Sequence, residues 1–186
     1  MSVDTFGARL PADLTLDDLA TMAAGDGYGH RFEMSPEGVL SIMPPAGIEH
    51  AVVASRLFAW FLTHGWPADR VLQNCGLRTA VGDGVGGRVP DLTVWSDPLV
   101  SGPVWAPIDG LLLAVEIVSR GSEAIDRIIK MDEYAKAGVP RYWIVDRDAA
   151  HTVTMWQLTS GDFVATLPAP QPMSWVLNST PDQYLR

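Results

Sequence analysis

The sequence predicts an α/β fold of the α+β type, in which a mixed central β-sheet is flanked by helices and carries additional β-hairpins towards both ends. The first observation behind this prediction is the apolar run from Leu111 to Val118, which only Glu116 interrupts. A run this apolar, bounded by glycines, is typical of a strand that is covered on both faces. The second observation is a helical pattern over 122–137 followed by an apolar strand over 141–146. Strand, helix and strand in this order predict a right-handed parallel crossover.

The other elements follow from apolar spacing and from turn residues. Thr15 and Asp18 form a capping-box pattern at the start of the first expected helix. The glycine-rich segment 82–87 lacks a following helix and a Gly-Lys-Ser/Thr ending, so we interpret it as a hairpin loop and not as a phosphate cradle. In order, we expect helices over 14–24, 48–63 and 122–137 and strands over 30–34, 39–43, 70–81, 88–95, 111–119, 141–146, 151–158 and 163–167.

The third helix has one apolar stripe. Its buried face is predicted by the helical spacing of Ile125, Ile128, Ile129 and Ala135. Lys130 follows the isoleucine pair directly and is expected at the border of this face. Gly138 stands where a C-cap glycine belongs, so we expect the helix to end there.

The composition indicates a single domain over residues 1–186, with a core over residues 30–158. The formal net charge of −9 counts against tight, non-specific binding of nucleic acid but leaves room for a local basic groove. The single cysteine, Cys75, excludes an internal disulfide and fits a reducing cytoplasm. Neither a signal-peptide pattern nor an apolar run of membrane-spanning length occurs, so we expect a cytoplasmic protein with no membrane contact. Candidates for the groove are Arg88, Arg120, Arg127 and Arg141.

Two carboxylates carry the chemistry that we expect. Glu116 is the one charged residue in an apolar strand. Burial of an ionised carboxylate there costs on the order of several kcal/mol unless a cation or hydrogen bonds compensate the charge. Asp91 follows Pro90, which donates no amide hydrogen bond and so marks an opening in the sheet. On neighbouring strands the two acids could share one divalent cation, Mg²⁺ or Mn²⁺, through oxygen ligands. The alternative is that Asp91 is a turn residue and that Glu116 pairs with a core arginine.

Three further residues are candidates for the same site. Lys130 could orient the attacking water or stabilise developing phosphoryl charge; the alternative is a solvated pair with Asp126, four residues earlier. Glu33 could be a third acid near the metal, or else an exposed strand carboxylate. His50, in the first turn of its helix, could hydrogen-bond Glu33 or a substrate phosphate, or could be structural.

These motifs resemble the PD-(D/E)XK nuclease core and, more closely, the Uma-type restriction endonucleases, a bacterial family of unknown function. The resemblance covers residues 15–158 and implies a restriction-endonuclease-like core that cleaves phosphodiester bonds with Mg²⁺. It implies Asp91, Glu116 and Ile117 as metal ligands. In that superfamily the lysine follows the strand acid by two residues, a position held here by Val118, so Lys130 would replace it from the helix. The matching segments are Arg88-Val-Pro-Asp91, Val115-Glu-Ile-Val-Ser119, Asp126 with Lys130 and Tyr134, the segment 137–146 and, upstream, Phe32-Glu33, Met43-Pro-Pro45 and His50.

Three functions remain open at this point. The favoured one is an Mg²⁺-dependent endonuclease with DNA as its partner, for which a homodimer would suit double-strand cleavage. The second is a non-catalytic binding protein on a nuclease scaffold, which the acidic balance and Val118 favour, because a fold alone does not determine a function. The third is a metal-dependent hydrolase of a small phosphate ester, which the sequence separates poorly from the first.

Overall fold

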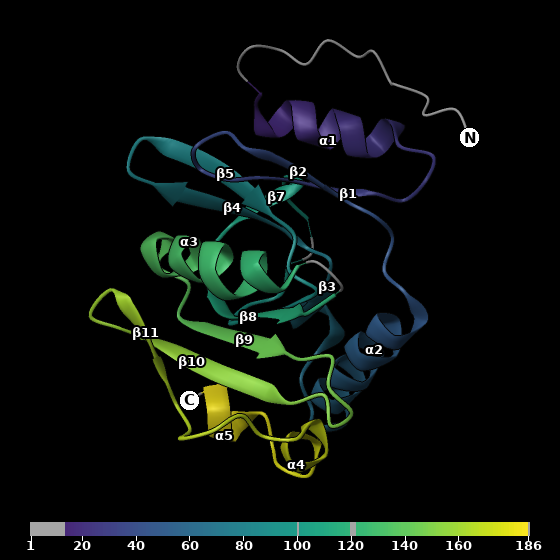
Figure 1. Ribbon diagram of the computed structural model, residues 1–186, viewed down its shortest axis with the longest axis vertical. Coiled ribbons are helices and arrows are strands. Elements are labelled where there is room, and N and C mark those ends of the chain that lie inside the picture. Colours follow the sequence, from purple (N-terminus) through teal and green to yellow (C-terminus); the bar gives the residue numbers. More distant parts are fainter. Residues whose placement is uncertain (1–13, 100, 120–121, 186) are drawn as a thin grey trace.

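Figure 1 shows the computed structural model, which describes residues 14–99, 101–119 and 122–185. The helices are α1 (Leu16–Gly25), α2 (Ile48–Thr63), η1 (Ala68–Arg70), η2 (Ile125–Ile129), α3 (Lys130–Ala137), α4 (Met173–Leu177) and α5 (Asp182–Leu185). The strands are β1 (Arg31–Met34), β2 (Leu40–Met43), β3 (Val71–Gln73), β4 (Gly76–Val81), β5 (Gly84–Arg88), β6 (Leu92–Trp95), β7 (Trp105–Pro107), β8 (Leu111–Ile117), β9 (Arg141–Val145), β10 (Val153–Thr159) and β11 (Asp162–Ala165).

The strands form two mixed sheets. One has the order β2-β1-β5-β4-β7, and the other has the order β11-β10-β9-β8-β6-β3. Each sheet contains one parallel pair, β4 with β7 in the first and β8 with β9 in the second. The α+β class with a mixed sheet flanked by helices is therefore confirmed, although the strands divide between two sheets instead of forming one.

The helices separate and cover these sheets (Figure 1). α3 lies between them, and Tyr134 of this helix belongs to an apolar cluster with Leu77 of β4 and Ala114 of β8. α1 packs on the outer side of the first sheet through Leu19, and α2, α4 and α5 pack on the outer side of the second. None of the helices in the described ranges has the length and apolar character needed to cross a membrane.

Several local predictions are confirmed. Thr15 and Asp18 form a complete capping box at the start of α1, and α2 has the expected bounds. The crossover from β8 through α3 to β9 is parallel, and Gly138 ends α3 with a φ of +87°. The C-terminal hairpin of β10 and β11 extends the second sheet. The single-domain organisation stays a prediction.

The antiparallel pairing expected for strands 70–81 and 88–95 occurs, but it is divided between the two sheets: β3 pairs with β6 in the second sheet and β4 pairs with β5 in the first. The first strand is interrupted at Asn74, which has a φ of +52°. The glycine-rich segment is mostly strand β5 and not a loop. A Cβ atom on Gly84 would lie 2.3 Å from the main-chain oxygen of Pro36, so this strand needs glycine where the turn between β1 and β2 approaches it. The sequence patterns also gave no signal for α4 and α5.

The predicted buried face of the third helix is also wrong. Ile128 and Ile129 are 68% and 47% exposed, whereas Lys130 of the same turn is 2% exposed. The first turns, over η2, are π-helical, a wide form that often occurs at functional sites. The helix therefore turns its charged side inwards, between the two sheets.

Candidate functional site

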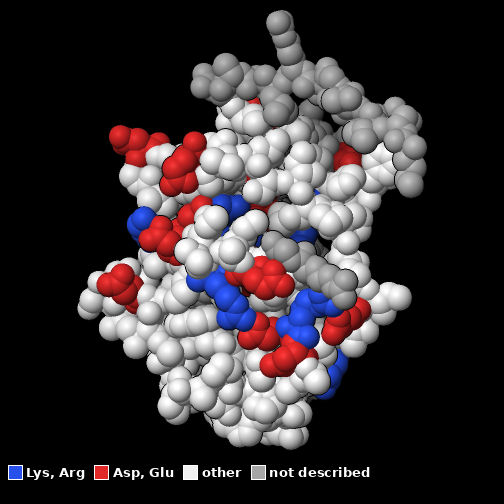
Figure 2. Space-filling view, in the orientation of Figure 1, with Lys and Arg blue, Asp and Glu red and all other residues white. Residues whose placement is uncertain are grey.

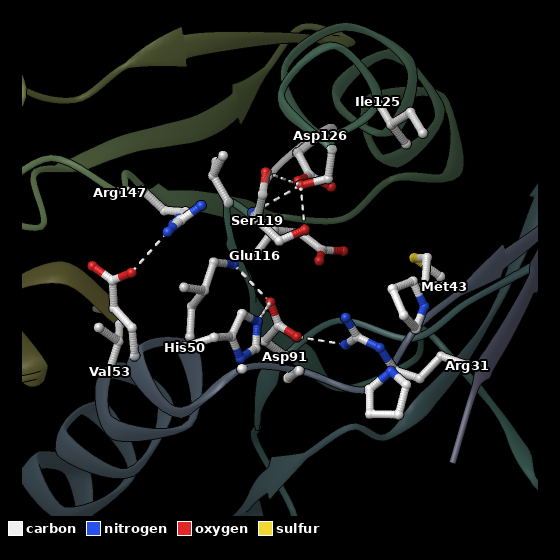
Figure 3. Close-up of a pocket in the computed structure, with 18 of the residues that line it drawn as sticks. Arg31, Met43, His50, Val53, Asp91, Glu116, Ser119, Ile125, Asp126 and Arg147 are labelled. Atoms are coloured by element: carbon white, nitrogen blue, oxygen red, sulfur yellow. Dashed lines mark hydrogen bonds and ion pairs between the residues drawn. The ribbon is translucent and has the colours of Figure 1, made fainter. Parts of the chain in front are cut away.

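A cavity of about 510 Å³ brings most of the expected site residues together. Its walls come from the connection between β2 and α2, the start of β6, the end of β8, and the helical turns that follow β8. Figure 3 shows the acidic side chains of Asp91, Glu116 and Asp126 at its centre. Expected site residues in its lining are His50, Asp91, Glu116, Ile117 and Lys130.

Asp91 is held from three directions. Leu92 of β6 pairs with Val115 of β8, which brings Asp91 beside Glu116 as expected from neighbouring strands. The amide of Ile117 donates to Asp91 Oδ2 at 2.7 Å, and Arg31 Nη1 donates to Oδ1 at 2.5 Å. Burial raises the pKa of Asp91, but His50, Arg31 and the Ile117 amide outweigh burial and hold it below its usual value. Asp91 therefore stays ionised. Ile117 contacts Asp91 through its main-chain amide. The role of Ile117 as a metal ligand stays a prediction.

Glu116 has a cation as its partner, as its burial requires. Lys130 Nζ lies 2.9 Å from Glu116 Oε1, and the Tyr134 hydroxyl donates to the same oxygen at 3.0 Å. Burial raises the pKa of Glu116 to about 8; Lys130 lowers it, whereas the nearby Asp126 and Asp91 raise it further. The alternative that a core arginine neutralises Glu116 is wrong, because a lysine occupies that place.

His50 lies beside Asp91 and not beside Glu33. Its Nε2 atom is 2.9 Å from Asp91 Oδ2, and the first turn of α2 presents it to the cavity (Figure 3). The orientation does not meet hydrogen-bond geometry, so this buried atom has no hydrogen-bond partner within the described ranges. The expected hydrogen bond from His50 to Glu33 is wrong.

Glu33 belongs to a buried ion-pair network behind the cavity. It is 0% exposed, so the alternative of an exposed strand carboxylate is wrong. Its carboxylate accepts from Arg88 Nη1 and Lys130 Nζ at 3.2 Å each, and from the Val89 amide at 2.9 Å. Arg88 in turn donates two hydrogen bonds to Glu133, at 2.7 and 2.6 Å. Lys130 is thus embedded in this network; it also lies 3.5 Å from Asp126, as the alternative expected, but this pair is buried and not solvated.

The three described arginines of the expected basic groove, Arg88, Arg127 and Arg141, do not line the cavity. Arg88 is 2% exposed and belongs to the buried network, and Arg127 forms an ion pair with Asp146. Arg141 is half-buried on β9, and Arg120 lies outside the described residues. Sequence patterns did not assign roles to Arg31 or Glu133. The one available signal was the spacing of polar residues on the third helix, at positions 126, 130 and 133.

The buried cluster has more acids than bases. It contains five carboxyl groups and three cationic side chains, so the acids outnumber the bases by two. Burial is the main cause of the raised pKa of Glu116, and the nearby acids Asp126 and Asp91 raise it further. The acids are Glu33, Asp91, Glu116, Asp126 and Glu133, and the bases are Arg31, Arg88 and Lys130.

A divalent cation fits this site in charge and in donor type. Among the described residues, no group of three or more His, Cys, Asp and Glu side chains is arranged to hold a metal ion. Mg²⁺ needs only one or two protein carboxylates, with water and phosphate oxygens as its other ligands. Asp91 and Glu116, on neighbouring strands and in one cavity, are such a pair.

Comparisons with known proteins identify the fold and the family. A solved structure described as a "putative nuclease belonging to DUF820" from Anabaena variabilis matches with a TM-score of 0.55 and 18% identity. The match covers 84% of this chain and 91% of that one, and at this identity it shows the fold alone. No curated protein matches the chain. A family model, Uma2, described as "Putative restriction endonuclease", matches residues 16–184. This match spans most of the sequence, and the chain therefore belongs to the Uma2 family.

Proposed function

We propose that the protein is a metal-dependent endonuclease that hydrolyses DNA phosphodiester bonds, with Mg²⁺ or Mn²⁺ held by Asp91 and Glu116. The observation that carries this proposal is that two carboxyl groups from neighbouring strands, Asp91 and Glu116, line one cavity in a buried cluster whose acids outnumber its bases by two. The membership of the chain in a family described as restriction endonucleases supports the same reaction class.

The side chains around the cavity would have different roles in the reaction. A bound divalent ion would polarise a phosphoryl oxygen and activate a water molecule. Asp91 keeps its charge because its pKa is lowered. The pKa of Lys130 is raised because Glu116, Glu33 and Asp126 outweigh its burial, so the ammonium keeps its proton. Lys130 would therefore act as a hydrogen-bond donor that orients water or stabilises phosphoryl charge, and not as a general base.

The replacement of the strand lysine by Lys130 is consistent with these contacts. Val118, at the usual lysine position, is 2% exposed and apolar. The Lys130 ammonium reaches Glu116 from the helix instead, at 2.9 Å, and lines the same cavity. A lysine from either element would bring one positive charge to the strand acid.

Plasmid nicking tests the proposal. Purified protein should nick supercoiled DNA with Mg²⁺ or Mn²⁺ and not with EDTA, and Asp91→Asn should abolish nicking. Asp162→Asn, on the exposed hairpin, is the matched control and should retain activity. Nicking that persists unchanged in Asp91→Asn would contradict the assigned site.

One observation favours a non-catalytic binding protein as the second candidate. The cationic side chains that line the cavity are already paired, as in the Arg147–Glu49 contact at 2.9 Å. This candidate predicts no metal-dependent cleavage of any nucleic acid. Homodimer formation and a cytoplasmic setting also belong to the proposal; light scattering tests the first and cell fractionation the second.

A further inference from the structure

The cavity combines its acidic centre with an apolar wall. Met43, Pro44 and Pro45 line it from the connection between β2 and α2, and Val118 and Ile125 line it from the other side. Figure 3 shows Met43 and Ile125, which come from different elements, near the carboxylates. Proline rings have a fixed backbone angle, so part of this wall is rigid before any ligand binds.

Large apolar side chains continue from this wall to the surface. Ile42, which lines the cavity, is 54% exposed, and Ile48, which follows the lining residue Gly47, is 86% exposed. Ile128, on the helical turn that carries Ile125, is 68% exposed. Of these three side chains, Ile42 is the one that lines the cavity, so it extends the apolar wall to the surface.

The charges around the cavity disfavour a ligand that binds mainly through its phosphates. Among the residues that the structure describes, the lysine and arginine side chains that line the cavity, Arg31, Lys130 and Arg147, each contact a carboxylate. Figure 2 likewise shows acidic and basic side chains intermixed on the face in view, without a continuous basic stripe. Duplex DNA binds largely by phosphate neutralisation, so a paired duplex should bind weakly here.

The size of the cavity points to one small planar group. A volume of about 510 Å³ is typical of sites for small molecules. Enzymes that act on a base hold it outside the helical stack in a close-fitting pocket, and damaged or unpaired nucleotides leave the stack at the lowest cost. Asp126 and His151 add polar groups beside the apolar wall, as the edge of a nucleobase requires.

We propose that the cavity is a subsite for one unstacked nucleobase, with the adjoining phosphate at Asp91 and Glu116. This inference rests on the nuclease function proposed above and specifies its substrate class as DNA with an unpaired nucleotide. The base lies against the apolar wall of Met43, Pro45 and Ile125, and burial of its faces there contributes to binding.

Ala46 offers a variant that fills the cavity without touching the acids. It is exposed on the connection between β2 and α2 and lines the cavity, so Ala46→Trp should fold. Ala165→Trp, on an exposed strand of the C-terminal hairpin, is the matched control. One oligonucleotide sequence is tested with Mn²⁺ as a single strand, as a duplex with one unpaired nucleotide, and as a fully paired duplex.

The expected result is cleavage of both unpaired forms at least about tenfold faster than of the paired duplex. Ala46→Trp should remove this preference, and Ala165→Trp should keep it. Equal cleavage of paired and unpaired DNA, or an unchanged preference in Ala46→Trp, overturns the inference and leaves the nuclease function standing.

If the protein cuts no DNA and the nuclease function fails, a binding measurement still tests the nucleobase subsite. Deoxyadenosine and thymidine, which carry no phosphate, are tested for binding by saturation-transfer NMR without metal. Binding that Ala46→Trp abolishes and Ala165→Trp retains supports a nucleobase subsite on a non-catalytic protein. Absence of binding, or equal binding to both variants, overturns it.

Discussion

The main-chain amide of Ile117 donates a hydrogen bond of 2.7 Å to the carboxylate of Asp91. Ile117 directly follows Glu116 in β8, so the strand that carries one acid also fixes the position of the other. Arg31 secures the second oxygen of Asp91. The two acids are therefore held at one place before any cation binds, which lowers the cost of assembling a metal site.

Lys130→Met should strongly destabilise the protein. The ammonium is 2% exposed and contacts Glu33, Glu116 and Asp126, all of them buried. Removing one partner of a buried ion pair costs about 3–5 kcal/mol, because the remaining charge is uncompensated. Urea denaturation measures this loss.

The same helix provides the control for this variant. Lys136 forms an exposed pair with Asp132, with 56% of its side chain accessible. Exposed pairs contribute little, so Lys136→Met should change stability far less than Lys130→Met does. Equal effects of Lys130→Met and Lys136→Met would contradict the buried network.

The stability of the metal-free protein should fall as the pH rises. Burial raises the pKa of Glu116 to about 8, above its ordinary value of 4.5. Between these values the folded state holds a proton that the unfolded state has lost, so the free energy of unfolding decreases with pH. The stabilisation is complete below about pH 4.5 and is lost as the pH passes about 8.

Thermal unfolding in EDTA across this range measures the effect. The midpoint should fall with pH in the wild type and stay flatter in Glu116→Gln, which carries no titrating group at this position. Because a divalent ion binds the ionised carboxylate, Mn²⁺ should stabilise the wild type more at high pH than at low pH. A midpoint that depends on pH equally in both proteins would refute the assignment of the raised pKa to Glu116.

Arg88→Met should disturb the network that positions α3. Arg88 binds Glu133 of this helix through two short hydrogen bonds and also contacts Glu33. We expect a loss of about 3–5 kcal/mol, and the double variant Arg88→Met with Glu133→Leu should recover much of it, because no unpaired charge remains on the helix. Urea denaturation of the single and double variants gives both values. If the double variant is less stable than Arg88→Met, the pairing is not the source of the loss.

Local patterns in the sequence were sufficient for much of the fold. The apolar run of β8, the helical spacing in α2 and the capping box at Thr15 each depend on residues close in the chain. The need of Glu116 for a cationic partner was also predictable, because burial of a lone carboxylate is costly wherever the strand lies.

Long-range packing explains what sequence patterns missed. The spacing of Ile125, Ile128 and Ile129 indicated a buried stripe, but α3 instead buries Lys130 against Glu33, which lies 97 positions earlier. Helical periodicity contains no information about such a partner. The division of the strand at Asn74 was also not predictable. The alternation of apolar and polar residues predicts a strand but does not indicate which sheet the strand joins.

The most direct test of the account is the position of Mn²⁺ in crystals soaked with the ion. The account predicts an anomalous peak between Asp91 and Glu116, with one oxygen of each at about 2.1 Å. In that state Lys130 should remain close to Glu116. An anomalous map without a peak between these two carboxylates, or with peaks only elsewhere on the protein, would contradict the proposed metal site.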